Sequence, residues 1–214
     1  MIWSIAEIAD ALEAALRAEA DRLDAEQSVR GLDALDELSV HPLLAGGLSA
    51  AGYGVFGEQH YPTVGRRQRD SEGERCDLVL TPGGRDLNDP SREPTLFDPP
   101  DAVALDEAFW LEVKVVCQFT PEGPNQRYAS QLLSTVREDV TKLSRNRGIR
   151  HAGLLIVLFV EGRSTAEHDL AEWLDRCLQR GLPVGSPSIR TFEITDRLGN
   201  GVCAAALYPV AGET

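Results

Sequence analysis

A glutamate and a lysine lie two residues apart in the apolar segment FWLEVKVV, residues 109–116. Side chains of a β-strand alternate between its two faces, so Glu112 and Lys114 should project from one face while Val113 and Val115 pack on the other. Burying two charged groups in such a segment is costly unless each finds a charged partner. A half-buried salt bridge is the plain structural explanation, and a reactive site is the functional one.

Two further acids precede this pair, each in its own short apolar segment. Asp77 lies in RCDLVL and Glu58 in YGVFGEQHYP, and both segments have the composition of strands. The arginine-rich stretch between them predicts a hairpin loop and antiparallel neighbours. Of the 21 basic residues only Lys114 and Lys142 are lysines. Because lysine is a compact charge with a tunable pKa, which arginine is not, its retention in an arginine-rich chain favours a chemical role.

The elements that must position these residues follow from the hydrophobic periodicity. Residues 2–27 predict a long amphipathic helix, and a second helix is expected to break or restart near Pro42 and to end at Gly52. The third strand, AFWLEVKVVCQF, precedes a helix that should stop at Gly148. The continuous apolar run HAGLLIVLFV predicts a central strand covered on both faces. Another helix, ending at Gly181, and two final strands complete the chain.

This order of elements predicts an α/β protein with a mixed sheet flanked by helices. We expect an N-terminal helical extension over residues 1–40 and one domain over residues 41–214. Residues 82–106 are rich in proline and lack periodicity, which predicts an insertion loop within that domain.

The amino-acid composition argues against several classes of protein. A net charge of -13 argues against a uniformly basic nucleic-acid binder, but local basic patches occur at Arg66, Arg67 and Arg69 and over residues 137–150. No segment has about 18 uncharged apolar residues, so no membrane association is expected. The first residues do not resemble a signal peptide, which predicts a cytoplasmic location. Four scattered cysteines predict free thiols rather than a zinc site or disulfides.

Taken together, GEQHYP, ERCDLVL, WLEVKVV and the helix YASQLLSTVREDVTKLSR resemble the PD-(D/E)xK nuclease superfamily over roughly residues 30–162. Two departures are the missing proline before Asp77 and the insertion before the third strand. The resemblance implies a restriction-endonuclease-like fold and a magnesium-dependent nuclease acting on nucleic acid, DNA in preference to RNA. Such an enzyme would act in repair, restriction or defence, alone or with partner proteins of that system. The alternatives are a catalytically inactive structural or interaction subunit and an enzyme for a small polar substrate.

Phosphodiester cleavage would give each residue a role. Asp77 and Glu112 would supply carboxylate oxygens to Mg²⁺, with Mn²⁺ as the alternative ion. Lys114 would orient or deprotonate the attacking water and stabilise the charge that develops. The resemblance also implies a third acid, for which we place Glu58 ahead of Glu37.

The helix after the third strand supplies two further candidates. Gln131 and Lys142 are candidates for phosphate contacts or for supporting the metal site. A solvated helix face with Asp139 and Lys142 as a pair is the alternative.

The first helix also suggests an assembly. We expect a symmetric homodimer with residues 2–27 at or near the interface. The reasons are the apolar stripe of this helix and the expectation that one active site cuts only one strand. The alternative is that the stripe covers the sheet of its own subunit.

Overall fold

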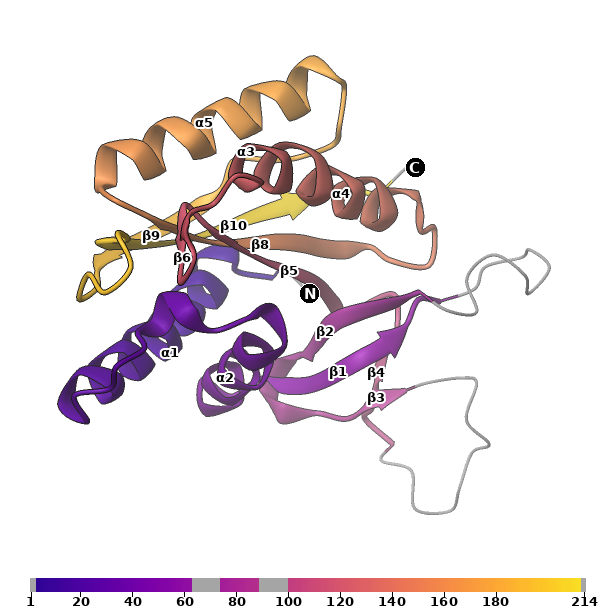
Figure 1. The fold of residues 1–214 in the computed structure, drawn as a ribbon. Helices are drawn as coiled ribbons and strands as arrows, with labels where there is room; N and C mark the ends of the chain where they lie inside the picture. The colour runs from indigo at the N-terminus through magenta and orange to yellow at the C-terminus, as the bar shows by residue number, and fades with distance from the viewer. Residues whose placement is uncertain (1–2, 63–73, 89–99, 213–214) are drawn as a thin grey trace.

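One six-stranded mixed sheet runs through the molecule in the spatial order β1, β2, β5, β8, β10, β9 (Figure 1). The computed structural model describes residues 3–62, 74–88 and 100–212. The strands of the sheet are β1 (Gly54–His60), β2 (Arg75–Thr81), β5 (Phe109–Cys117), β8 (His151–Val160), β9 (Ser188–Glu193) and β10 (Val202–Val210). β5 and β8 run parallel, and every other neighbouring pair is antiparallel. The expected α/β class with a mixed sheet flanked by helices is confirmed.

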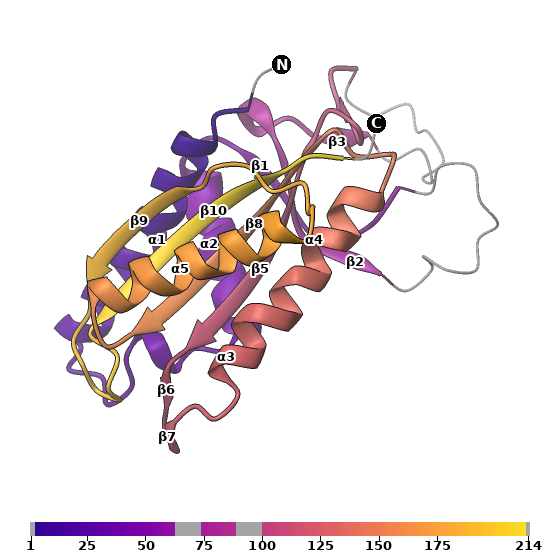
Figure 2. The same ribbon diagram turned by 90° about the horizontal axis from the view of Figure 1, so that it is seen from above.

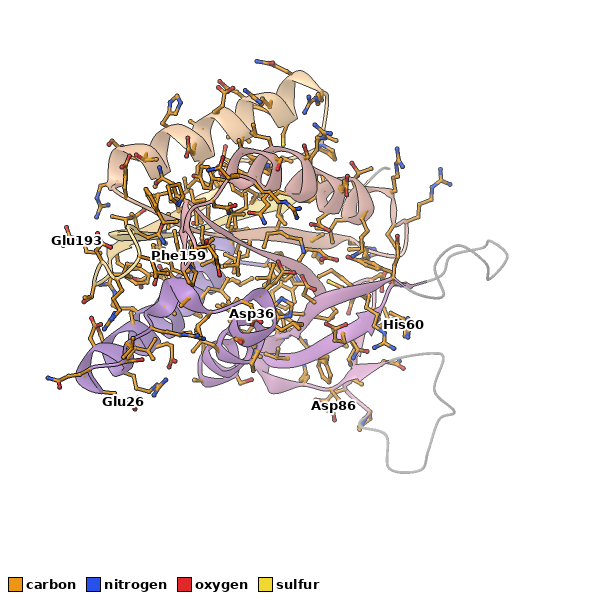
Figure 3. The ribbon with its side chains drawn as sticks, in the orientation of Figure 1. Glu26, Asp36, His60, Asp86, Phe159 and Glu193 are labelled. Carbon is orange, nitrogen blue, oxygen red and sulfur yellow. The ribbon has the colours of Figure 1, made fainter. Side chains whose placement is uncertain are left out.

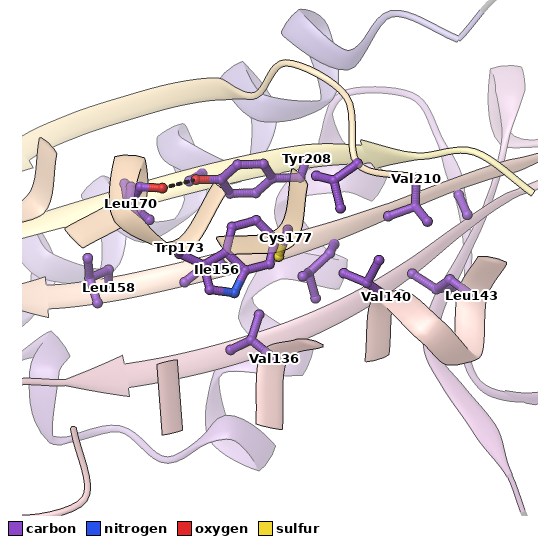
Figure 4. Close-up of a cluster of buried hydrophobic side chains, with 14 of the residues drawn as sticks. Val136, Val140, Leu143, Ile156, Leu158, Leu170, Trp173, Cys177, Tyr208 and Val210 are labelled. Carbon is purple, nitrogen blue, oxygen red and sulfur yellow. Dashed lines mark hydrogen bonds between the residues drawn. The ribbon is translucent and has the colours of Figure 1, made fainter. Parts of the chain in front are cut away.

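Helices cover both faces of the sheet (Figure 2). One face carries α1 (Ile5–Ala25), a short 3-10 helix (Leu32–Ala34) and α2 (Glu37–Ala50), and the other carries α3 (Tyr128–Ser130), a π-helical segment (Gln131–Thr135), α4 (Val136–Arg145) and α5 (Arg163–Gln179). Each face has its own apolar core. Figure 4 shows part of the second core, where Val136 and Val140 of α4 and Trp173 of α5 meet Ile156 of β8. The expected central position of β8 is confirmed, since its residues from Ala152 onward are buried.

The apolar stripe of α1 is buried within its own chain. Ser4 caps the helix by accepting a hydrogen bond from the Glu7 backbone N–H, and Ile8, Leu12 and Leu16 are fully buried against the sheet. The stripe therefore covers the sheet of its own subunit, which removes the reason for placing a dimer interface on these side chains. Dimerisation itself stays a prediction.

The expected break of the second helix near Pro42 is wrong. Asp36, labelled in Figure 3, accepts a hydrogen bond from the Ser39 backbone N–H at 2.8 Å and caps α2, which then runs without a break to Ala50. Pro42 is exposed, so the carbonyl that loses its helical N–H partner lies on the side of the helix open to water. The expected stop at Gly52 is confirmed by its positive φ of 90° just after the helix.

A short 3-10 helix and two short strand pairs lie outside the main sheet in the described part of the chain. Within the predicted insertion, the described residues form a 3-10 helix (Pro82–Gly84) and the parallel pair β3 (Leu87–Asn88) and β4 (Val103–Ala104). β6 (Phe119–Thr120) and β7 (Gly123–Pro124) form a small hairpin after β5. The rest of the insertion, residues 89–99, and the predicted basic patch at Arg66, Arg67 and Arg69 lie outside the described residues.

The N-terminal helices share the core of the sheet. α1 and α2 pack against β2, β5, β8 and β10 in one apolar cluster. A boundary between residues 40 and 41 would cut α2 within its length. Among the described helices, none combines the length and the apolar character needed to span a membrane.

Candidate functional site

The site lies where β2 separates from β5. The two strands pair from Leu80↔Phe109 to Leu78↔Leu111, and at the next residue the Asp77 side chain accepts the Val113 backbone N–H at 2.7 Å in place of a backbone partner. Beyond this point the backbones of β2 and β5 no longer pair, and polar side chains of α2 and α4 meet those of β5 there, at what we call the opening. Asp77 and Glu112 therefore face each other across this opening, as the sequence predicted for two converging carboxylates.

Glu112 and Lys114 project from the same face of β5, as strand alternation predicted. Val113 belongs to the core beneath α1 and α2, whereas Trp110 and Val116 belong to the core beneath α4 and α5. Because Glu112 and Lys114 alternate with Val113, they point toward the α4 side. The pair is thus part of a polar opening bounded by apolar residues on the same strand.

Glu112 is almost completely enclosed, with its side chain 2% exposed. Lys142 of α4 places its Nζ atom 2.7 Å from Glu112 Oε1, and the Tyr61 hydroxyl donates a short hydrogen bond to the same oxygen. Tyr61 follows β1 and stacks on the ring of Trp110 with centroids 5.5 Å apart. These contacts satisfy the carboxylate that the sequence left without a partner.

Lys114 is bound between acids from two helices. Its Nζ atom lies 3.0 Å from Glu37 Oε1 in α2 and 3.7 Å from Asp139 Oδ2 in α4. Burial acts to lower the pKa of Lys114, but the charges of Asp139 and Glu37 outweigh it and leave that pKa raised. Lys114 is therefore a protonated ammonium group in the metal-free protein.

Of the side chains that the structure describes around this opening, more are acidic than cationic. Among the described residues, five carboxyl groups converge there against two ammonium groups and one imidazole: Glu37, Glu58, Asp77, Glu112 and Asp139, with Lys114, Lys142 and His41. Burial, together with the nearby charge of Glu112, raises the pKa of Asp77 to about 8. Burial likewise raises the pKa of Asp139 to about 6. Such raised values mark a site that would gain from an additional cation.

Three residues of the cluster are close enough together to hold a metal ion. His41, Glu58 and Asp77 each offer one ligand atom, and these atoms lie within 4.8 Å of one another. His41 Nε2 is 3.9 Å from Asp77 Oδ2 and is buried, with no hydrogen-bond partner in the part of the chain that the structure describes. Burial lowers the pKa of His41, which keeps the imidazole neutral and its lone pair available. Two carboxylates and a neutral imidazole fit a divalent cation.

The backbone at Glu58 is strained. Its φ of 53° lies in the left-handed region, which non-glycine residues adopt rarely, and the regular pairing of β1 with β2 passes over it between Gly57↔Leu78 and Gln59↔Cys76. His60, two residues later, lies at the outer end of the strand (Figure 3). Strain of this kind is held in place by surrounding structure and concentrates at functional sites. Glu58 lies beside Asp77, since the register of β1 and β2 is the same on both sides of it.

The structure brings together most of the residues singled out from the sequence. Both candidates for the third acid are present, with Glu58 beside Asp77 and His41, and Glu37 bound to Lys114. The predicted residues that meet at the opening are Asp77, Glu112, Lys114, Lys142, Glu58 and Glu37. The pairing of Lys142 with Glu112 places it against a carboxylate, rather than leaving it on a solvated helix face.

Gln131 lies apart from this cluster. It is exposed and its Oε1 atom accepts a hydrogen bond from Asn125 Nδ2 at 2.9 Å. It precedes Lys142 by eleven residues, roughly 16 Å along a helix. No contact between Gln131 and the cluster occurs among the described residues, so a direct role at the metal-capable group is not supported by its position.

Sequence reasoning missed His41 and Tyr61. His41 lies four residues after Glu37, the spacing that puts two side chains on one helix face, but the helix break expected at Pro42 concealed this relation. Tyr61 gave no signal, because its contact with Glu112 spans 51 residues of sequence. Comparison of the chain with known family models, curated proteins and solved structures gave no match.

Proposed function

We propose that this chain is a divalent-metal-dependent nuclease of the restriction-endonuclease-like fold that hydrolyses phosphodiester bonds of DNA. The observation that carries the proposal is the convergence of Asp77, Glu112 and Lys114 with a metal-capable imidazole and glutamate at one opening of the sheet. The succession of a helix, three antiparallel strands, a second helix and a strand parallel to the third supports the fold. A role in repair, restriction or defence, alone or with partner proteins, accords with this activity.

The metal would be held by His41, Glu58 and Asp77. A divalent ion bound there supplies charge neutralisation at the scissile phosphate and a lower pKa for a bound water. Mg²⁺ prefers oxygen ligands, whereas an imidazole nitrogen beside two carboxylates favours Mn²⁺ and other transition ions. We therefore propose Mn²⁺ as an effective ion alongside the Mg²⁺ that the resemblance implies. The positive φ of Glu58 marks a strained backbone position of the kind that concentrates at functional sites.

Lys114 would act as a fixed positive charge rather than as a general base. Its raised pKa keeps the ammonium protonated, and Glu37 and Asp139 hold it in position. From there it would orient the attacking water and stabilise the negative charge that develops on the phosphate. Of the two roles that the sequence predicted for Lys114, orienting the water or deprotonating it, we therefore propose the first.

Exposed basic residues beside the opening suit a polyanionic substrate. Arg75 begins β2, two residues before Asp77. Arg145 is the last residue of α4 and Arg147 follows the helix, both close to Lys142 in sequence. They offer phosphate contacts on an otherwise acidic body with a net charge of -13. These positions support nucleic acid as the substrate class.

The test is a cleavage assay on linear, circular, branched and single-stranded DNA with Mn²⁺ or Mg²⁺. We expect metal-dependent cleavage by the wild type and at least a hundredfold loss in Asp77→Asn. Glu138→Gln is the matched control, since Glu138 is an exposed acid next to Asp139. Metal binding without cleavage of any substrate would instead favour the inactive structural or interaction subunit.

A further inference from the structure

Glu112 forms an ion pair with Lys142. Lys142 Nζ lies 2.7 Å from Glu112 Oε1, and the Tyr61 hydroxyl donates to that same atom. With the carboxylate 2% exposed, little water can compete for this oxygen. A charge-assisted hydrogen bond in such surroundings is strong and directional.

The Lys142 ammonium is fixed in position from three directions. Besides Glu112, its Nζ donates to the Arg75 backbone carbonyl at 3.1 Å and lies 5.0 Å from the centre of the Tyr61 ring. A ring face attracts a cation, so all three neighbours favour a positive charge at this point. An arginine could not supply it in the same way, because its guanidinium group is planar and larger. Lys142 is one of two lysines in the chain.

The metal-capable group shares Asp77 with this arrangement but does not include Glu112. His41, Glu58 and Asp77 bring their ligand atoms within 4.8 Å of one another, and Glu112 is not among them. Asp77 nevertheless interacts with Glu112. Two-metal sites in phosphodiester hydrolysis hold their ions about 3.5–4 Å apart. A second ion shared by Asp77 and Glu112 would have to compete for the Glu112 carboxylate with Lys142, whose Nζ atom is already 2.7 Å from Glu112 Oε1.

We propose that the Lys142 ammonium is a built-in cation at Glu112, which takes the place of a second divalent ion, so that this chain binds one ion per site. The inference rests on the proposed metal-dependent function and defines its stoichiometry. Lys142 then acts as a positioning residue: it holds Glu112 in one orientation beside Asp77 and balances its charge. Tyr61 assists by fixing the shared oxygen atom.

Calorimetric titration of the metal-free full chain with Mn²⁺ tests this directly. We expect one ion per chain for the wild type and two for Lys142→Met, with the second at least tenfold tighter than any second event in the wild type. Arg145→Met is the matched control, because it removes an exposed positive charge from the same helix one turn away. It should retain one ion.

The outcomes separate this inference from the proposed function. Two ions in the wild type, or one ion with unchanged affinity in Lys142→Met, would overturn the inference while a metal-dependent nuclease remained. One ion in the wild type and two in Lys142→Met, without DNA cleavage, would support the inference and defeat the nuclease. No binding to the wild type would overturn both.

A measurement on the wild type covers the case in which Lys142→Met does not fold. With two lysines, the ¹⁵N-labelled side-chain ammonium signals can be assigned by comparison with Lys114→Arg. The Lys142 signal should persist when Mg²⁺ saturates the protein, because the ammonium stays on Glu112. A shift to the position of a free lysine would show that an ion displaces it and would overturn the inference.

Discussion

Neutralising the two facing carboxylates should change the stability of the metal-free protein in opposite directions. Asp77→Asn removes a charge that burial and Glu112 disfavour, while the new amide oxygen can still accept the Val113 N–H. Glu112→Gln removes a charge that Lys142 requires. We therefore expect Asp77→Asn to stabilise the protein and Glu112→Gln to destabilise it.

The pKa of Asp77 sets the magnitude. It rises from 3.8 to about 8 on folding. Over the 3.2 pH units between 3.8 and 7, this disfavours folding by about 4 kcal/mol. The new amide of Asp77→Asn is itself buried, so we expect this variant to recover half of that free energy, about 2 kcal/mol. For a chain of this length, this corresponds to a rise in Tm of roughly 4–8 °C. Glu112→Gln should lose about 1–3 kcal/mol, since Lys142 keeps a neutral acceptor but loses the charged one.

The contribution of Asp77 to folding stability should depend on pH in a definite direction. A folded pKa above the unfolded value means that the folded state binds the extra proton, so the unfavourable contribution is absent below about pH 4. It grows as the pH rises toward 8 and is constant above that. The Tm difference between Asp77→Asn and wild type should follow the same course.

Thermal unfolding of metal-free protein between pH 4 and pH 8.5 measures this difference. A Tm gain for Asp77→Asn that does not vary with pH would refute the reasoning, as would a loss at pH 8. Glu138→Gln should show neither effect, because Glu138 is exposed. If both carboxylate variants unfold, a salt bridge that serves the fold is the better account of the cluster.

Three further predictions concern the metal and the reaction. Lys114→Ala should lose cleavage at least a hundredfold yet keep Mn²⁺ affinity by calorimetry, because Glu37 and Asp139 bind Lys114 while other residues face the ion; full activity would remove its role. His41→Ala should weaken Mn²⁺ binding at least tenfold and Mg²⁺ binding less; equal losses would argue against a nitrogen ligand. The Mn²⁺ Kd should fall about tenfold per pH unit up to about pH 8, because Asp77 must lose its proton first; a flat profile would contradict this.

The sequence by itself determined the features that arise from local geometry. Alternation along β5 placed Glu112 and Lys114 on one face, and the succession of two short strand-like segments predicted that β1 and β2 are antiparallel neighbours. A continuous apolar run identified β8 as central. These inferences held because the periods of strands and helices are fixed by covalent geometry and operate over a few residues.

The tertiary structure decided which charges meet. Lys114 reaches Glu37 across 77 residues of sequence because α2 lies on the sheet where β2 leaves β5. His41 joins Asp77 only because α2 continues through Pro42, with the proline on the exposed side. Pairing across such separations depends on strand order, on the point where two strands part and on how each helix packs. None of these is encoded in a local pattern, since the free energy of each contact depends on partners far along the chain.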